Sequence, residues 1–207
     1  MVTLTTDVEL LRRWREGDAK AGNELFRRHF HSLYRFFRDK TTGGADDLIQ
    51  ATFLACVRAR DQFRGDSSFR TYLFTVARHQ LYRHIRAHAR APELDFAHTS
   101  LLDIATSPSV VLERDQRRAQ LLQALRRLPL EQQLLLELYY WEDVPPRELA
   151  TVFEIPGSTA RTWLQRAREA LRAALEAEAR SPSTAWSDAD LDAWARDLRA
   201  REEGDDD

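Results

Sequence analysis

Five polar side chains fall on one side of a predicted helix near residue 160: Arg161, Thr162, Gln165, Arg166 and Arg168. Guanidinium, hydroxyl and amide groups are the ones that bond phosphate oxygens and base edges in DNA. On the opposite side, apolar residues recur at the spacing of a helix face that packs inward: Ala160, Leu164, Ala167 and Leu171. An amphipathic helical hairpin with a solvated basic face would show a similar pattern. DNA binding is the interpretation that we favour.

A second helix and a turn complete this arrangement. A short helix that ends near Phe153 comes first, and Pro156 and Gly157 close the turn after it. We expect Ser158 or Thr159 to cap the next helix by accepting a hydrogen bond from a backbone N–H of its first turn. The predicted motif is a helix-turn-helix, which presents its second helix to the major groove of DNA.

The composition indicates an all-α protein. The 207 residues can form one or two modest domains, and apolar residues recur at helical spacing over long stretches with few Gly or Pro between them. No apolar run is long enough to cross a bilayer. The single cysteine, Cys56, cannot form an internal disulfide, which fits a reducing compartment. We therefore expect a cytoplasmic protein with no membrane insertion.

The charged residues divide the chain into four parts. Residues 1–90 hold 17 basic and 10 acidic side chains, residues 91–115 one and five, residues 116–180 ten and nine, and residues 181–207 three and nine. We expect two helical domains, 1–90 and 116–180, joined by a flexible acidic linker and followed by an acidic C-terminal extension. The basic first domain suits a polyanionic partner. We hypothesise that the extension restrains activity by covering a basic DNA-binding surface.

Four helices are expected in the first domain. A short one stops near Gly17, and longer ones follow at about 21–38, 45–62 and 69–90. We expect Phe30 on the buried side of the second. The last mixes arginines with aromatic rings, and this mixture suits single-stranded nucleic acid, because cations follow the phosphates while exposed rings stack on bases. Most of these rings could instead belong to the core.

Two parts of the chain resemble bacterial sigma factors, most closely the extracytoplasmic-function group of the sigma-70 family. Asp46–Leu54 and Phe63–Arg78 resemble region two, and Leu125–Arg168 resembles region four. The resemblance covers about residues 7–90 and 112–175, in the expected order. It implies a sigma factor that binds core RNA polymerase, recognises and melts promoter DNA and directs promoter-specific transcription initiation, and that is not itself an enzyme.

The same resemblance assigns roles to particular residues. The polymerase-docking positions are Asp46, Asp47, Gln50 and Phe53. The positions that melt and hold the minus-ten element are Arg64, Arg70, Tyr72, Arg78, His79, Arg83 and Arg86. Those that read the minus-thirty-five element are Ser158, Thr159, Arg161, Thr162, Gln165 and Arg166. By resemblance, the acidic linker would thread towards the polymerase active-site channel, and an anti-sigma protein is the usual regulator.

Several positions depart from the family pattern. His79 stands where Asn is frequent, Ala51 where an acidic residue usually follows Gln50, and Trp163 where a basic residue is usual. Glu154 stands where a turn Gly is frequent. These departures bear on which promoter sequence is read, because Trp163 cannot pair with guanine as Arg does.

The sequence gives little support for metal binding or catalysis. His84 and His88 have the spacing of a two-His metal site, but a third ligand is missing and arginines surround them. We expect no metal, no cofactor and no catalysis. Two alternatives stay open: a conventional helix-turn-helix transcriptional regulator with an N-terminal sensing or dimerisation domain, and a helical adaptor that binds only protein. Polymerase binding would separate all three.

Overall fold

The structure, a computed structural model, describes residues 6–41, 44–60, 63, 67–89, 94–104, 116–178, 189 and 191–193. The chain groups into two compact units: residues 1–90 with Thr151–Glu154, and residues 91–150 with residues 155–207. The described secondary structure of both units is helical, apart from one isolated bridge between Ser100 and Pro129. The predicted all-α fold class is confirmed. None of the helices in the described part of the chain is long and apolar enough to cross a membrane.

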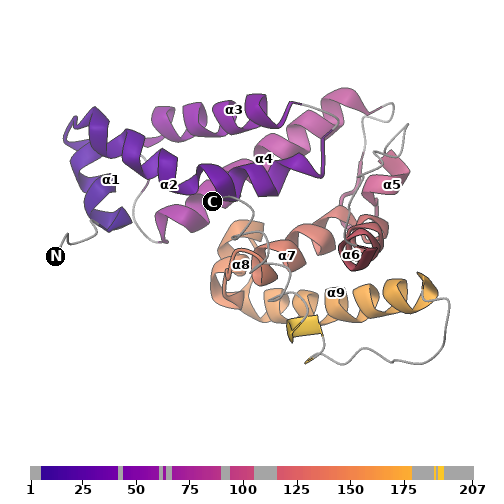
Figure 1. The fold of residues 1–207 in the computed structure, drawn as a ribbon. Coiled ribbons are helices and arrows are strands. Elements are labelled where there is room, and N and C mark those ends of the chain that lie inside the picture. Colours follow the sequence, from indigo (N-terminus) through magenta and orange to yellow (C-terminus); the bar gives the residue numbers. More distant parts are fainter. Residues whose placement is uncertain are drawn as a thin grey trace. The chain divides into compact units, whose positions relative to one another are not determined.

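The helices described in the first unit are α1 (Asp7–Arg15), α2 (Ala19–Arg38), α3 (Ala45–Arg58) and α4 (Phe69–His88) (Figure 1). Three of them follow a polar residue whose side chain accepts a hydrogen bond from a first-turn N–H: Thr6, Asp18 and Ser68. α3 instead follows Gly44, which has a left-handed φ of 84°. Asp46 and Asp47 lie in its first turn, where negative charge favours the helix dipole.

The core of the first unit consists mainly of side chains from α2 and α4. Its fully buried large side chains include Leu25, Leu33, Phe37, Leu73 and Phe74. Burying a side chain of this size contributes about 1.5–3 kcal/mol. α1 packs closely on α2 because Gly22 has no side chain: a Cβ there would lie 2.5 Å from the Trp14 ring.

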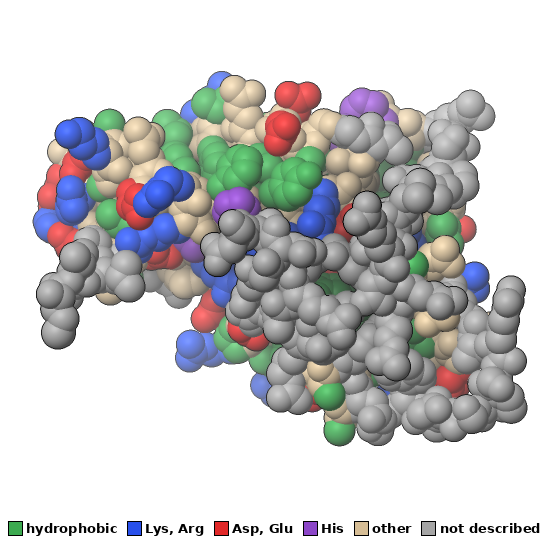
Figure 2. All heavy atoms as spheres, in the orientation of Figure 1, with side chains coloured by type: hydrophobic (Ala, Val, Ile, Leu, Met, Phe, Trp, Pro, Cys, Tyr) green, Lys and Arg blue, Asp and Glu red, His purple; other side chains and the backbone are tan. Residues whose placement is uncertain are grey.

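One aromatic residue of α2 differs from the prediction. Phe30, expected in the core, is 39% exposed, and Tyr34 one turn later is 41% exposed. The buried side of α2 instead runs through Leu25, His29 and Leu33, and Phe30 lies at the edge of that side. Figure 2 shows hydrophobic side chains at the surface over this helix.

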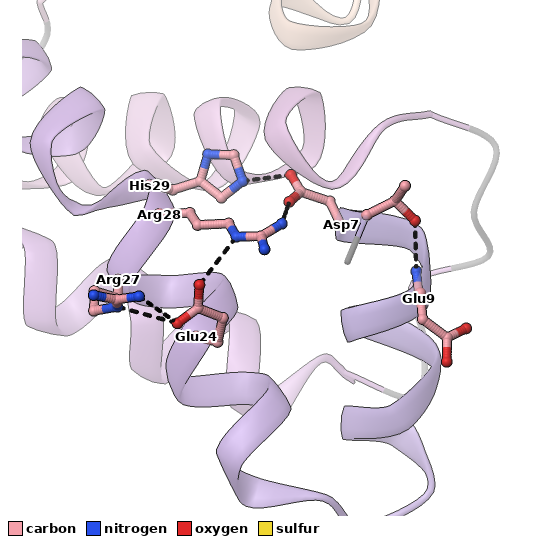
Figure 3. Close-up of polar contacts among 7 residues, drawn as sticks. Asp7, Glu9, Glu24, Arg27, Arg28 and His29 are labelled. Carbon is pink, nitrogen blue, oxygen red and sulfur yellow. Dashed lines mark hydrogen bonds and ion pairs between the residues drawn. The ribbon is translucent and has the colours of Figure 1, made fainter. Parts of the chain in front are cut away.

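A polar cluster joins α1 to α2 (Figure 3). Asp7 Oδ2 lies 2.7 Å from Nε2 of His29, and Asp7 Oδ1 accepts a hydrogen bond of 3.2 Å from Arg28. Arg28 also donates to Glu24 at 3.2 Å. The hydrogen bond with His29 lowers the pKa of Asp7 below its ordinary value, and Arg28 adds to this, although burial opposes both. An ionised Asp7 therefore holds the first helix against the second.

The second unit contains α5 (Leu101–Ile104), α6 (Gln116–Arg127), α7 (Leu130–Tyr140) and α9 (Gly157–Glu178), and α8 (Pro146–Phe153) leads into α9. α6 and α7 both pack on α9. The buried side chains that fill this core come from all three helices and include Leu125, Leu134, Leu138, Leu164 and Ala167.

Part of the predicted linker packs against the start of α7. The carbonyls of Phe96 and Thr99 accept hydrogen bonds from the N–H groups of Glu131 and Leu130, at 3.1 and 3.0 Å. The first turn of α7 has no side-chain cap, so these carbonyls bond amides that the helix itself leaves unpaired. Phe96 is only 3% exposed. Burial of Phe96 and these two hydrogen bonds hold this part of the predicted linker against α7, and the flexibility of the linker stays a prediction.

Candidate functional surfaces

The helix-turn-helix consists of α8, a turn at residues 154–156, and α9. Glu154 has a φ of 57°, in the left-handed region. Gly adopts this conformation without steric cost, which explains why a Gly is favoured at this turn position. α9 begins at Gly157, so Ser158 and Thr159 lie inside its first turn. The N-cap position is Pro156, so the prediction that Ser158 or Thr159 caps the helix is wrong by two or three positions.

α9 has one apolar and one polar face. The predicted apolar stripe is confirmed, since its members are at most 5% exposed: Ala160, Leu164, Ala167 and Leu171. Around the other side, exposed polar side chains follow one another over more than two turns: Ser158, Arg161, Thr162, Gln165 and Arg166. Thr159 and Trp163 are half-buried between the two faces. The exposed face therefore offers cations, hydroxyls and an amide, and it contains no apolar side chain.

Arg168 does not belong to this exposed face, although the helical spacing placed it there. Its side chain is 18% exposed. Its guanidinium lies 4.9 Å from the ring centre of Tyr139 and 5.5 Å from that of Tyr140, both on α7. Position 168 lies at the border of the polar and apolar faces, and two aromatic rings from the neighbouring helix cover it.

The exposed face of α3 has a different chemistry. Asp46, Asp47 and Gln50, predicted to dock on polymerase, are all exposed at its N-terminal end. Leu54 and Val57 continue the same face and are 47% and 45% exposed. Sequence reasoning assigned neither to a site, although Leu54 lies four residues after Gln50 and Val57 three residues after Leu54, on one side of the helix. The α3 face therefore combines acidic and apolar groups.

Phe53 lies beside this face and not on it. Its ring centre is 4.5 Å from that of Phe26 on α2, and the side chain is half-buried.

Burial, together with the neighbouring His88, lowers the pKa of His84, although Asp47 opposes this. Because the ordinary pKa of His is already below 7, His84 is neutral at pH 7 and adds no positive charge beside Asp47.

The predicted minus-ten residues on α4 differ in exposure. His79, Arg83 and Arg86 are exposed, and Arg70 is half-buried with its guanidinium 5.7 Å from the Phe74 ring centre. Arg78, by contrast, is buried at 6% exposed, with its guanidinium 5.6 Å from the ring centre of Tyr82 on the same helix. Arg64 lies outside the described residues.

Most aromatic rings that alternate with these arginines are core residues. Phe74 is fully buried and Tyr82 is 8% exposed. Tyr72 is half-buried, with its ring centre 4.8 Å from that of Phe63. Of these three rings, Tyr72 has the largest share of its side chain at the surface.

Comparison with known proteins places both units in one family. Residues 25–91 match Sigma-70 region 2, and residues 118–171 match Sigma-70, region 4. The RNA polymerase sigma-H factor of Pseudomonas aeruginosa is 32% identical over 190 residues, which cover 85% of this chain and 97% of that protein. The chain belongs to the extracytoplasmic-function group of the sigma-70 family. The ECF RNA polymerase sigma-E factor of Escherichia coli is 28% identical over 176 residues, 80% of this chain and 92% of that protein.

Two solved structures share the fold. CnrH in complex with the cytosolic domain of CnrY has a TM-score of 0.61 and 23% identity, covering 82% of this chain and 97% of that one. The sigma factor RpoE in complex with the anti-sigma factor NepR, from Bartonella quintana, has a TM-score of 0.50 and 20% identity, covering 72% and 92%. At these identities the likeness establishes the arrangement of helices alone.

The two family regions separate the candidate surfaces. Region 2 contains α3 and α4, with every predicted polymerase-docking and minus-ten position. Region 4 contains the exposed face of α9. The C-terminal segment after residue 180 lies outside both matches.

Proposed function

We propose that this chain is a sigma factor that binds core RNA polymerase and directs promoter-specific transcription initiation. The observation that supports this most directly is the presence of region 2 and region 4 in one chain, in that order. A conventional regulator with a sensing or dimerisation domain would lack region 2. Sigma factors are initiation factors and not enzymes, and the chemistry of RNA synthesis belongs to the polymerase.

The α3 face is the proposed docking surface for core polymerase. Asp46, Asp47 and Gln50 supply polar contacts that set orientation, and Leu54 and Val57 supply apolar area that the partner removes from water. Interfaces of this kind depend on a few buried anchors surrounded by polar groups. Phe53 supports the face from beneath through its contact with Phe26.

α4 and the segment before it are the proposed minus-ten surface. The cations that would follow the single strand are Arg64, Arg70, Arg78, Arg83 and Arg86. Tyr72 supplies a ring for stacking, worth about 1–3 kcal/mol per base. His79 is exposed and can donate or accept a hydrogen bond according to its tautomer, so it is the proposed determinant of base choice.

The exposed face of α9 is the proposed reader of the minus-thirty-five element in duplex form. Arg161, Gln165 and Arg166 can reach base edges, and the hydroxyls of the first two turns suit phosphates. Those hydroxyls belong to Ser158, Thr159 and Thr162.

An anti-sigma protein is the third proposed partner. It is suggested by the two sigma-factor structures of similar fold, one solved with the anti-sigma factor NepR and the other with the cytosolic domain of CnrY. We infer that the chain acts in the cytoplasm, because core polymerase and chromosomal DNA are there.

Transcription by sigma-free core polymerase tests the proposal. The template is fragmented DNA from the source genome, and RNA start sites are mapped with and without the protein. We expect new starts that share two spaced upstream elements. Binding to core without new starts would indicate an inhibited sigma factor. Absence of both core binding and new starts would contradict the proposal and favour the conventional regulator.

A further inference from the structure

The C-terminal segment contacts the flank of α9. Leu191 is 1% exposed, and Asp192 Oδ1 lies 3.4 Å from Nη2 of Arg168. Both residues belong to the same compact unit as α9. They follow the region 4 match by 20 or more residues, so this contact is an addition to the family domain and not part of it.

The contact completes a site for the guanidinium of Arg168. Tyr139 and Tyr140 lie against it from α7, and the carboxylate of Asp192 approaches from the C-terminal segment. Tyr139, Tyr140 and Asp192 also line a pocket of about 280 Å³, together with Asp143, Val144 and Pro145. Since the guanidinium is mostly enclosed by these groups, solvent screens its pairing with Asp192 less than it would at an exposed site.

Arg168 also belongs to a row of residues that leads from the proposed DNA-reading face. Arg161, Gln165, Arg168 and Arg172 are spaced at i, i+4, i+7 and i+11, which places them in one line along α9. Arg161 and Gln165 are exposed. A carboxylate paired with Arg168 therefore places negative charge next to the surface that would follow a DNA phosphate backbone.

We propose that the C-terminal segment docks in cis on Arg168 and lowers the affinity of α9 for DNA. This inference rests on the proposed DNA-binding function of α9. The segment acts through charge. Asp192 neutralises the guanidinium of Arg168, and residues 181–207 contain nine acidic and three basic side chains. The base-reading side chains themselves stay exposed. Neutralisation at the flank of the helix thus replaces the initial hypothesis of a covered surface.

The test compares two substitutions that change the net charge of the full chain equally. Asp192→Asn removes the partner of Arg168, whereas Asp205→Asn removes a carboxylate elsewhere in the same segment. The probe is a labelled duplex of about 30 base pairs, because phosphate contacts do not depend on sequence. At about 0.1 M salt we expect Asp192→Asn to raise the affinity about fivefold and to steepen the salt dependence by nearly one counterion, and Asp205→Asn to change both much less.

Two further variants show whether the effect passes through the docked contact. In an Arg168→Ala background, Asp192→Asn should raise the affinity no more than Asp205→Asn does. Leu191→Ala changes no charge and should raise DNA affinity by weakening the docking. Thermal unfolding of each variant shows that it is folded.

Three results would overturn the inference. Equal affinities for the Asp192 and Asp205 variants would overturn it while leaving the proposed function intact. A lower affinity for Asp192→Asn would mean that the segment supports α9 instead of restraining it. Failure of every protein, wild type included, to bind the duplex would overturn both the inference and the proposed DNA-binding role of α9.

Discussion

The exposed faces of α3 and α9 belong to helices of the same protein but have opposite chemistry. Along α3, two carboxylates and an amide are followed by Leu54 and Val57, both nearly half exposed. Along α9, every exposed residue from Ser158 to Arg166 is polar or basic. Both helices bury a mainly apolar side, so the chemical difference between them lies in their exposed faces.

This difference assigns the two faces to different classes of partner. Exposed Leu and Val side chains gain free energy only when another apolar surface covers them, which a protein can do and a phosphate backbone cannot. A face of arginines, hydroxyls and amides gains little from apolar contact but can release counterions from DNA and read base edges. The residues left exposed are therefore more informative about the partner than the helices that carry them.

The largest effect is expected from a charge placed in the apolar part of the α3 face. Leu54→Glu should weaken binding to core polymerase by about 100-fold, because a buried anchor is lost and an unpaired carboxylate would be desolvated. Duplex DNA binding should stay unchanged. Asn23→Glu, at an exposed position of α2, adds the same charge and serves as the control in a competition assay for core. Equal losses in both variants would show that charge alone, and not the α3 anchor, matters.

The next effect concerns the α9 face. Arg161→Ala or Arg166→Ala should weaken binding to the minus-thirty-five duplex by about 1–3 kcal/mol if the arginine reads a base, while core binding is retained. Arg27→Ala, at an exposed arginine of α2, is the matched control. Fluorescence anisotropy with the cognate and a scrambled duplex measures the change. Wild-type affinity at physiological salt would exclude a reading role for that arginine.

Salt should separate the two faces without any substitution. If α9 neutralises two phosphates, raising the salt from about 50 to 200 mM should weaken duplex binding about tenfold. Docking through Leu54 and Val57 should change less, because apolar burial is not screened by ions. Parallel titrations of DNA and of core over this range check the contrast. A steeper salt dependence for core binding would mean that the carboxylates, not the apolar pair, dominate the α3 face.

The smallest effect concerns the stability of the first unit. The pKa of Asp7 is lowered in the folded state, so the stability it contributes is present above the unfolded pKa of about 4 and is lost as the pH falls through the lower folded value. Asp7→Asn should cost about 1 kcal/mol at neutral pH and should flatten this acid dependence. Thermal melts at a series of pH values measure both. Glu9→Gln, in the same helix, should flatten the acid dependence less, because the ion pair of Glu9 with Arg12 is exposed to solvent.

Much of the fold could be predicted from the sequence because helical periodicity is a local property. The stripe through Ala160, Leu164 and Ala167 was predicted and is buried, and the helices of the first unit begin and end within four residues of their predicted bounds. The exposure of Phe30 and Leu54 was not predicted. An apolar residue at helical spacing is buried only where another element covers it, and the spacing does not say which elements do so.

The sequence by itself determined the helical elements, the helix-turn-helix and the family, because these depend on residue types at short, regular separations. The tertiary structure decided which groups those elements leave in water. It placed two tyrosines from α7 and Asp192 from the C-terminal segment around Arg168, and Phe96 against the start of α7. Such contacts join residues 20 or more positions apart, and their free energy depends on burial and on distances that arise only when the helices pack.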